Sequence, residues 1–149
     1  MNTVLEKEQL VILSERNYRK IHHVSYDTVL GMENSFAQEG VSIYRLSPIM
    51  KKINSAFRKL KLKQVPDFTI RCNANKYYLF ICMAMQDLEA QTATLKWLSH
   101  NTHRVLLYCF DTWEAQYEKW DQLFSIIKPA HIFFAYKHSK EYFQQRYDQ

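Results

Sequence analysis

Glycine and proline are scarce in this sequence, which has two of the first and three of the second among 149 residues. Folds with many short strands depend on these residues at their turns, so their scarcity argues against a many-turned sandwich and favours long regular elements. Cysteine is also sparse, and Cys72, Cys82 and Cys109 form an odd, widely spaced set. Cys82 and Cys109 lie inside predicted buried strands, so we expect them to be reduced core thiols, and we expect neither a disulfide framework nor a zinc site.

Long apolar runs and ligand-binding signatures are absent as well. No run approaches the roughly 20 apolar residues of a membrane span, and no charged-then-apolar leader opens the chain, so we expect a cytoplasmic protein. With Gly31 and Gly40 as its two glycines, the sequence has no G-x-G-x-x-G or G-x-x-x-x-G-K-[ST] loop to cradle phosphate. It also lacks C-x-x-C, H-E-x-x-H and G-x-S-x-G, and we expect no cofactor and no metal.

Residues 104–136 carry the clearest secondary-structure pattern. An apolar run at 105–110 ends in Asp111, and a second apolar run follows Pro129 at 131–136. Between them, large apolar residues recur at spacings of 4, 3, 4 and 3: Trp113, Tyr117, Trp120, Phe124 and Ile127. The runs predict two buried parallel strands and the spacing predicts a helix, which together make a right-handed βαβ unit.

The rest of the chain alternates between strand and helix in the same way. Up to residue 46 we expect a helix at 1–20, a strand at 21–26, a loop around Gly31, a short helix closed by Gly40 and a strand at 41–46. After these we expect a helix from Ser47-Pro48 to about Lys63, a strand at 76–85, a helix opened by Asp87 and, following the βαβ unit, a last helix at 139–147. The sum predicts a single domain over residues 1–149. Its fold class is α/β: a doubly wound, mostly parallel sheet of about five strands, with helices on both faces, as in Rossmann-like sandwiches.

Polar residues follow several of the predicted strands. Open parallel sheets bind ligands at the carboxyl ends of their strands. The sequence places these residues there: Tyr26 and Asp27 after the first strand, Asp111 and Trp113 after 105–110, and Lys137 and His138 after the last. Helix capping is the competing interpretation for Asp111, and a solvated turn is the competing one for Lys137 and His138.

The positive charge is concentrated in one element. The net charge is +5, and positions 45–63 hold no acid and seven basic residues: Arg45, Lys51, Lys52, Arg58, Lys59, Lys61 and Lys63. We expect the apolar face of this helix to pack on the sheet and the cations to face outward; its residues are Ile49, Ile53, Phe57 and Leu60. Such a face is either merely solvated or binds an anionic membrane surface. Nucleic acid is not favoured as a partner, because the aromatic residues do not interleave with these cations.

One family resembles this chain in its strands and helices. The N-terminal domain of two-Rossmann-domain (GT-B) glycosyltransferases is similar to residues 105–120, Val-Leu-Leu-Tyr-Cys-Phe-Asp-Thr-Trp-Glu-Ala-Gln-Tyr-Glu-Lys-Trp, and to residues 132–143, Ile-Phe-Phe-Ala-Tyr-Lys-His-Ser-Lys-Glu-Tyr-Phe. In that domain a strand ending in Asp leads into a Trp-rich helix. Its loop and first helix are similar to residues 29–38, Val-Leu-Gly-Met-Glu-Asn-Ser-Phe-Ala-Gln. The resemblance covers most of the chain after about residue 21.

The resemblance implies acceptor binding for transfer of a sugar from a nucleotide sugar. Such enzymes hold the nucleotide sugar mainly in a second Rossmann domain, so a further domain or subunit is the implied partner, and this chain alone is expected to be inactive. A sugar or a lipid-linked molecule is the implied acceptor. The implied acceptor-binding residues are Tyr26, Gly31, Asn34, Trp113, Lys137 and His138. Asp27 and Asp111 are the implied catalytic residues, one of them as general base on an acceptor hydroxyl.

A second function class is compatible with the same sequence. The chain would then be a non-enzymatic Rossmann-like module that docks through its basic helix on an acidic partner or on a membrane surface. Its anion-contacting residues would be Lys51, Lys52, Arg58, Lys59, Lys61 and Lys63. The glycosyltransferase family that this chain resembles includes members that contact the membrane through a basic amphipathic helix. We therefore expect peripheral membrane contact whether the chain is a glycosyltransferase domain or a non-enzymatic module.

Overall fold

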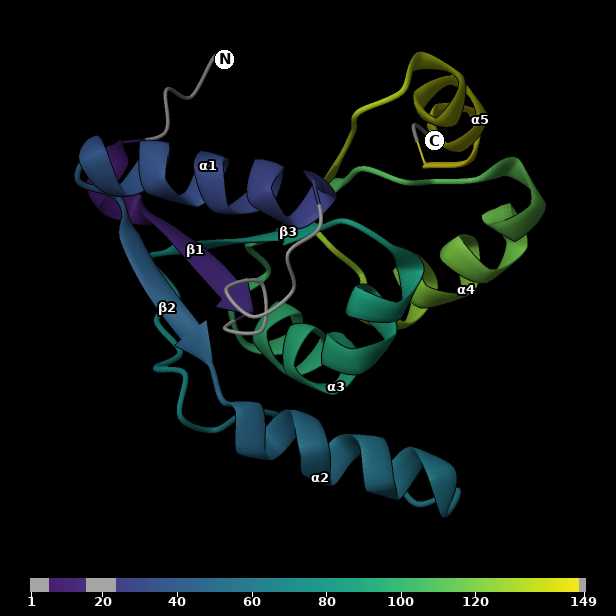
Figure 1. Cartoon of the computed structure of the whole chain (residues 1–149), viewed down its shortest axis with the longest axis horizontal. Helices are drawn as coiled ribbons and strands as arrows, with labels where there is room; N and C mark the ends of the chain where they lie inside the picture. The colour runs from purple at the N-terminus through teal and green to yellow at the C-terminus, as the bar shows by residue number, and fades with distance from the viewer. Residues whose placement is uncertain (1–5, 16–23, 148–149) are drawn as a thin grey trace.

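Five parallel strands form the centre of the computed structural model, which describes residues 6–15 and 24–147 (Figure 1). The strands are β1 (Leu10–Glu15), β2 (Ser42–Leu46), β3 (Tyr77–Cys82), β4 (Val105–Cys109) and β5 (His131–Phe134). Their order in the sheet is β2-β1-β3-β4-β5, and each neighbouring pair is parallel. The predicted α/β class, with a parallel sheet of about five strands, is confirmed.

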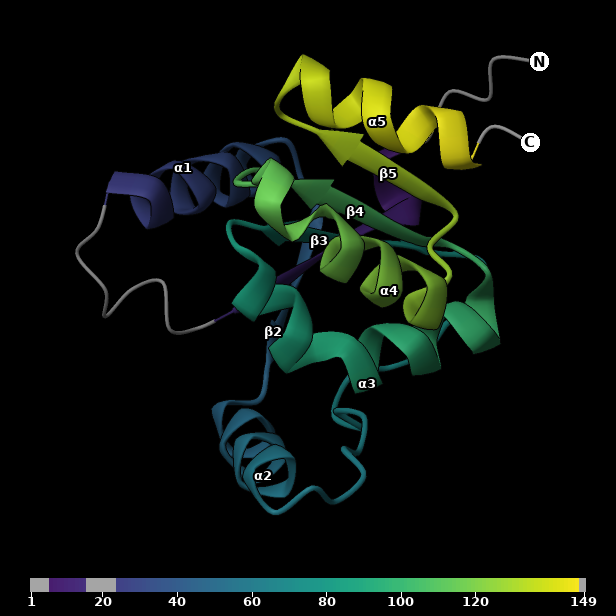
Figure 2. The same ribbon diagram turned by 90° about the vertical axis from the view of Figure 1, so that its right-hand side faces the viewer.

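Helices cover both faces of this sheet. They are α1 (Val24–Gln38), α2 (Pro48–Lys59), α3 (Met85–Thr102), α4 (Tyr117–Ile127) and α5 (Lys137–Tyr147), with short 3-10 turns at Lys7–Gln9 and Glu114–Gln116. Figure 2 shows α1 on one face of the sheet and α3 and α4 on the other, while α5 lies beside the edge strand β5. The helix α2 lies at the bottom of both views, farther from the sheet than α3.

The alternation of side chains along each strand divides the core into two layers. In β1, Val11 and Leu13 join the larger cluster under α3, α4 and α5, whereas Ile12 joins a smaller cluster under α1. The predicted stripe of α4 supplies much of the larger layer, because Tyr117, Trp120, Phe124 and Ile127 are all buried. Trp113 lies outside that helix and is 66% exposed.

The N-terminal elements differ from the sequence-based expectation. Residues 10–15 form β1 inside the segment that we predicted as a helix. Val11, Ile12 and Leu13 are buried between β2 and β3 on both faces of the sheet, and continuous apolar runs are typical of such strands. Of the strand predicted at 21–26, residues 24–26 instead begin α1, and residues 21–23 lie outside the described part of the chain.

Glycine has different roles at its two positions. Gly31 lies in the middle of α1, so the loop expected around it is wrong. Gly40 follows the end of α1 with a φ of +85°, a left-handed conformation that glycine adopts without steric cost, as predicted for a helix end. The predicted N-cap of α2 is also confirmed, because the Ser47 hydroxyl accepts a hydrogen bond from the Met50 amide at 3.3 Å. That helix ends at Lys59, four residues earlier than Lys63.

The cysteines are distributed as their positions in the sequence predict. Cys82 and Cys109 are buried and lie opposite each other in the register of β3 and β4. Burial raises the pKa of the Cys82 thiol well above its usual range, and its contact with Cys109 adds to the effect. Cys72 is exposed in the connection between α2 and β3. Within residues 6–15 and 24–147, none of the helices is long and apolar enough to cross a bilayer.

Candidate functional site

The connections of neighbouring strands diverge between β1 and β3. The helix α1 leaves β1 toward β2 on one face of the sheet, while α3 leaves β3 toward β4 on the other face. Strands whose connections leave on opposite faces have a crevice beyond their carboxyl ends, and open α/β sheets bind ligands in this crevice. The candidate site therefore lies where β1 ends at Glu15 and β3 ends at Cys82.

The carboxylate of Glu15 is a buried charged group at this crevice, with the residue only 3% exposed. The Lys51 ammonium of α2 donates to Oε2, and the Gln91 amide of α3 donates to Oε1. Both carboxylate oxygens thus have a partner from a different helix. This arrangement fixes α2 and α3 against the end of β1, and it holds a negative charge in place beneath the crevice.

A second carboxylate lies across the sheet from Glu15. Successive residues of a strand point to opposite faces, so Ser14 faces α1, where its hydroxyl donates to Glu33 Oε2 at 2.7 Å. Both of these residues are buried. The end of β1 is therefore flanked by one buried glutamate on each face of the sheet.

Asp87 is the acidic side chain at the end of β3. It lies in the first turn of α3, where its carboxylate accepts a hydrogen bond from the Ala84 amide at 3.1 Å. Burial raises the pKa of this carboxyl group, and the negative charge of Glu15 raises it further, while the Ala84 hydrogen bond and Lys51 lower it. A raised carboxyl pKa in a crevice is a property of general bases, although capping of α3 also explains the position of Asp87.

A comparison of the wild type with the Asp87→Asn variant should show the effect of this raised pKa on the free energy of unfolding. Because the folded-state pKa lies above the unfolded value of about 3.9, the stabilising contribution of the neutral acid is complete below that value. It is lost as the pH rises through the folded-state pKa. Asn keeps an oxygen to cap α3, so the stability of the wild type relative to Asp87→Asn should fall with rising pH, measured by urea unfolding from about pH 3.5 to 7. Glu118→Gln on the exposed face of α4 is the control, and a difference that rises with pH would contradict the assignment.

Asp67 has a structural role next to this site. It is 2% exposed, and its carboxylate accepts hydrogen bonds from the Ser47 amide at 2.6 Å and from the Thr69 amide at 3.0 Å. Its own amide donates to the Thr94 hydroxyl at 3.0 Å. These bonds fix the start of α2 against α3, so the position of Lys51 over Glu15 depends on them.

The structure places four of the predicted site residues at the ends of β4 and β5, as expected. Asp111 and Trp113 follow β4, and Lys137 and His138 open α5 directly after β5. The Asp111 amide donates to the Met83 carbonyl at 3.0 Å, which brings Asp111 next to the end of β3. Asp111 does not cap α4, which begins only at Tyr117 after a 3-10 turn.

A cluster of hydroxyl groups fixes these two strand ends to each other. Ser139 in α5 is fully buried, and the Thr112 hydroxyl donates to its oxygen at 2.5 Å. The Tyr117 hydroxyl lies 3.1 Å from the same oxygen. The loop that carries Asp111 is therefore adjacent to the start of α5.

The predicted residues near the first strand occupy a helix instead of a strand end. Tyr26 and Asp27 lie in the first turn of α1, and Gly31 and Asn34 lie one and two turns further along it. Asp27, Gly31 and Asn34 are exposed. Gly31 has ordinary helical geometry and open space around its α-carbon, so glycine is not required there for a close approach to the backbone.

The sequence analysis missed Glu15, Glu33 and Gln91. A signal for Glu15 was present, because Leu10-Val-Ile-Leu-Ser-Glu15 is an apolar run that ends in an acid, like residues 105–111. Glu33 and Gln91 lie in helices and have no such signal. Within the described ranges, no three His, Cys, Asp or Glu side chains are grouped so that they could hold a metal ion.

The helix α2 has the opposite orientation to the one that we expected. Its buried side chain is Asn54, whose amide donates to the Val65 carbonyl at 2.7 Å and whose oxygen accepts from the Val65 amide at 2.9 Å. With Lys51 bound to Glu15, these polar contacts hold the polar face toward the body of the molecule. Of the four apolar residues that we expected to pack on the sheet, Ile49 and Leu60 are consequently 69% and 68% exposed, Ile53 is 36% exposed and Phe57 is half-buried.

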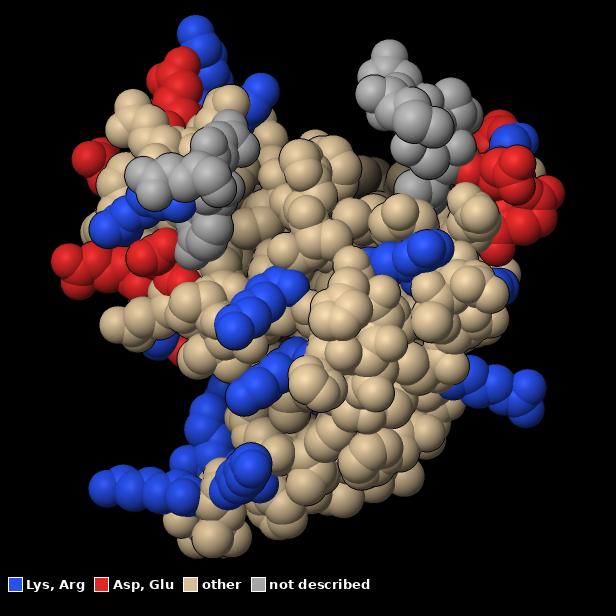
Figure 3. All heavy atoms as spheres, turned by 180° about the vertical axis from the view of Figure 1, so that it is seen from behind, with Lys and Arg blue, Asp and Glu red and all other residues tan. Residues whose placement is uncertain are grey.

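The cations of residues 45–63 do not form one uniform surface. Lys51 is bound to Glu15, and Arg58 lies 4.0 Å from Glu89 of α3. The exposed cations of this segment that form no ion pair within the described part of the chain are Arg45, Lys52, Lys59, Lys61 and Lys63. Figure 3 shows blue side chains at the lower left, over the C-terminal end of α2, while red side chains gather mainly near the top.

Comparisons with protein-family models, with curated proteins and with solved structures gave no match for this chain.

Proposed function

We propose that this chain is the acceptor-binding domain of a glycosyltransferase of the two-Rossmann-domain type. The proposal rests on the resemblance of residues 105–143 to that family, and a shared fold alone would not carry it. The observation that supports it best is the acidic crevice between β1 and β3, where Glu15, Asp87 and Asp111 lie at or next to the strand ends. Carboxylates suit a site that binds hydroxyl groups and removes a proton from one of them.

The carboxylates at the crevice and on α1 would have different roles. Glu15 has both oxygens engaged by Lys51 and Gln91, so it would position these groups instead of reacting. Asp111 is half-exposed and follows the end of β4, where it could accept a proton from an acceptor hydroxyl. Asp27 is exposed in the first turn of α1 and is the second candidate for that role.

Nuclear magnetic resonance with an alkyl glycoside tests acceptor binding directly. We expect octyl glucoside, below its critical micelle concentration, to shift amide signals of residues 83–87 and 110–113 in the labelled chain. Asp111→Asn should weaken this binding, whereas Asp121→Asn, at a position of α4 that is half-buried like Asp111, is the matched control. Shifts confined to α2 or α5, or an unchanged affinity in both Asp111→Asn and Asp27→Asn, would contradict the proposed site.

The proposed division of labour predicts that this chain has no transferase activity by itself. Mixed with a panel of nucleotide sugars and octyl glucoside, the chain should yield no glycosylated product by mass spectrometry, because the donor site would belong to another domain or subunit. Formation of a product would show that the donor site is within this chain.

A second candidate function is docking of α2 on an anionic membrane surface. The specific observation is the outward stripe of Ile49, Ile53 and Leu60, which continues into Leu62 at 54% exposure. Lys52 and Lys59 border this stripe along one side of the helix, and Lys61 and Lys63 follow its end. Apolar side chains with flanking lysines are typical of helices that lie in the lipid interface, and each lysine near an anionic surface adds about 1 kcal/mol.

Lipid explains this surface better than an acidic protein does. An acidic protein would complement the lysines but would not require a stripe of three large aliphatic side chains on the outermost face of the helix. A bilayer interface accepts both groups together, the aliphatic residues below the headgroups and the lysines among them. The polar inner face of α2 keeps the stripe outward without any contribution from the membrane.

Flotation with vesicles of phosphatidylcholine and phosphatidylglycerol tests this function. We expect the wild type to float with anionic vesicles at low salt and the Lys52/Lys59/Lys61/Lys63→Gln variant to lose most of its bound fraction. Ile49→Ser combined with Leu60→Ser should lose binding as well. Ile126→Ser, at an exposed apolar position of α4, is the matched control and should bind like the wild type. If the wild type remains unbound at low salt, or if the α2 variants float like the wild type, α2 is not a membrane anchor.

A further inference from the structure

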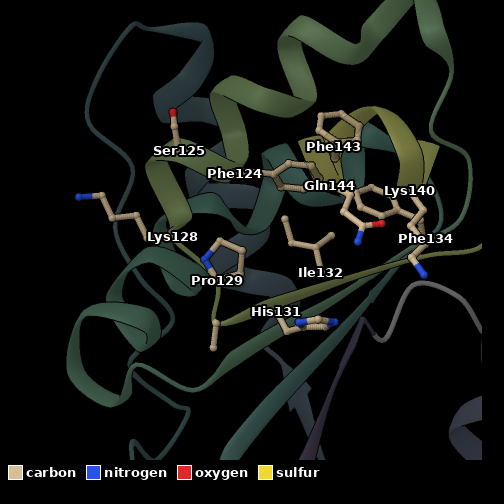
Figure 4. A pocket seen from close by; sticks show the side chains of 11 residues that line it. Phe124, Ser125, Lys128, Pro129, His131, Ile132, Phe134, Lys140, Phe143 and Gln144 are labelled. Atoms are coloured by element: carbon tan, nitrogen blue, oxygen red, sulfur yellow. The ribbon is translucent and has the colours of Figure 1, made fainter. Parts of the chain in front are cut away.

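A cavity of about 700 Å³ lies alongside the edge strand β5, between α4 and α5 (Figure 4). Its volume is within the range of about 300–1,000 Å³ that is usual for small-molecule sites. None of the residues described above as the crevice site lines this cavity. Three strand spacings, roughly 14 Å, separate β5 from β1, so the cavity is distinct from the crevice at the switch point.

Aromatic rings form the inner wall of the cavity. Phe134 of β5 and Phe143 of α5 stack with centroids 5.1 Å apart and an interplanar angle of 5°. Phe124 of α4 meets Phe143 edge-to-face at 5.3 Å, and it meets Phe134 in the same way at 6.1 Å. Figure 4 shows these rings gathered above Ile132. Phe124 and Phe143 are each 1% exposed and support this wall from behind, whereas Phe134 and Ile132 are half-buried and form the apolar surface that a hydrocarbon group can contact. Because the rings pack against one another, this surface can receive such a group without reorganising.

The rim of the cavity is cationic. Lys128 and Lys140 line it together with His131, and none of the lining residues is acidic. Lys128 ends α4 in a left-handed conformation with a φ of 54°, and its carbonyl accepts a hydrogen bond from the Ser99 hydroxyl at 2.5 Å. The two lysines come from α4's end and from α5, so they lie on opposite helices that border the cavity. In Figure 4 Lys140 and Gln144 lie together on one side, whereas Lys128 extends outward on the other.

We propose that this cavity binds an anion with a hydrocarbon body, such as a medium-chain alkyl carboxylate or alkyl phosphate. The aromatic wall and Ile132 receive the chain, and Lys140, assisted by the Gln144 amide, binds the head group. An uncharged hydrocarbon ligand would leave the cationic rim unused, and a small inorganic anion would leave the apolar wall exposed. The combination of both surfaces in one cavity selects a molecule that carries both groups.

A chain-length series with decanoate as the main probe tests this proposal. We expect binding of decanoate by calorimetry, weaker binding of octanoate and still weaker binding of hexanoate, by about fourfold for each pair of methylene groups if half of their surface is buried. Inorganic phosphate alone should not bind detectably. Decyl phosphate, compared with decanoate, identifies which of the two head groups the rim prefers.

Two sets of variants separate the rim from the wall. We expect the Lys128→Gln/Lys140→Gln variant to bind decanoate about tenfold more weakly while its affinity for decanol stays the same. Lys96→Gln, on an exposed part of α3 that does not line the cavity, is the charge control. Gln144→Phe places a large ring at the exposed edge of the cavity and should abolish binding without altering the core beneath.

Several results would overturn the proposal. They are absence of decanoate binding to the wild type, equal binding of decanol and decanoate, and amide shifts that map to α2 instead of residues 124–144. A dimer in light scattering that Gln144→Phe dissociates would show that a second copy of the chain covers this cavity, which also excludes a small-molecule ligand there. An affinity for decanoate that is unchanged in both the Lys128→Gln/Lys140→Gln variant and Gln144→Phe would also overturn the proposal.

Discussion

Replacement of Trp120 by alanine should lower the free energy of unfolding by about 4 kcal/mol. Trp120 is fully buried, and it is the largest of the side chains that the core encloses completely. Its ring packs beside Phe124 in α4, at a centroid distance of 5.7 Å, and it faces the sheet as part of the larger core layer. Alanine would leave a cavity that the surrounding strands and helices could fill only in part.

The smaller replacement Trp120→Phe separates the effect of lost packing from the effect of the buried polar Nε1 group. The indole Nε1 has no hydrogen-bond partner among the described residues, and a buried donor without a partner costs about 1–3 kcal/mol. Phenylalanine removes that donor together with part of the ring, so its net effect should be much smaller than that of alanine. Urea unfolding followed by circular dichroism measures both variants. If Trp120→Phe and Trp120→Ala are equally destabilising, burial of the unpaired Nε1 donor has little effect on the free energy of unfolding.

Replacement of Glu15 by alanine should lower the free energy of unfolding by about 3 kcal/mol. The change removes the partner of Lys51 and leaves the Gln91 amide without its acceptor. The effect is expected at the lower end of the range for a broken buried pair, because the Lys51 side chain is 28% exposed and can reach water. Glu15→Gln retains an oxygen for Gln91 and should cost about half as much.

A double-mutant cycle tests whether the two charges act together. Lys51→Ala should be less destabilising in the Glu15→Ala background than in the wild type, since the ion pair is already lost there. Glu118→Ala, at the exposed surface of α4, is the control for removal of a glutamate and should change stability by less than about 0.5 kcal/mol. If the effects of the two substitutions are additive, Lys51 does not stabilise the fold through Glu15.

The central and C-terminal parts of the sheet could be predicted because their signals are local. The apolar runs that became β3, β4 and β5 are bounded by turn residues or caps, and Pro129 separates α4 from β5. The strand β1 was missed for the opposite reason. Residues 10–15 lie in a polar surrounding without such boundaries, and the strand is fixed by its pairing with β2 and β3, which are 30 to 70 positions away in sequence.

The candidate site could be predicted only where it follows a recognised strand. Asp111 was found because the end of β4 was found, whereas Glu15 was missed together with β1. The partners of Glu15 come from α2 and α3, and no spacing in the sequence indicates that Lys51 and Gln91 meet at one carboxylate. Sequence periodicity identifies which residues share a side of a helix, but it does not determine which side faces the protein. In α2 the contacts of Asn54 with Val65 decide this, and they leave the aliphatic stripe in solvent.

The arrangement of the three cysteines has a practical consequence for labelling. Cys82 and Cys109 are enclosed by the core, so under native conditions a maleimide dye can reach Cys72 and neither of the other two. The wild-type chain thus carries a natural attachment point for one fluorophore, in the segment between α2 and β3. A dye at this point would report on vesicles approaching α2 by energy transfer, with no engineered residue in the chain.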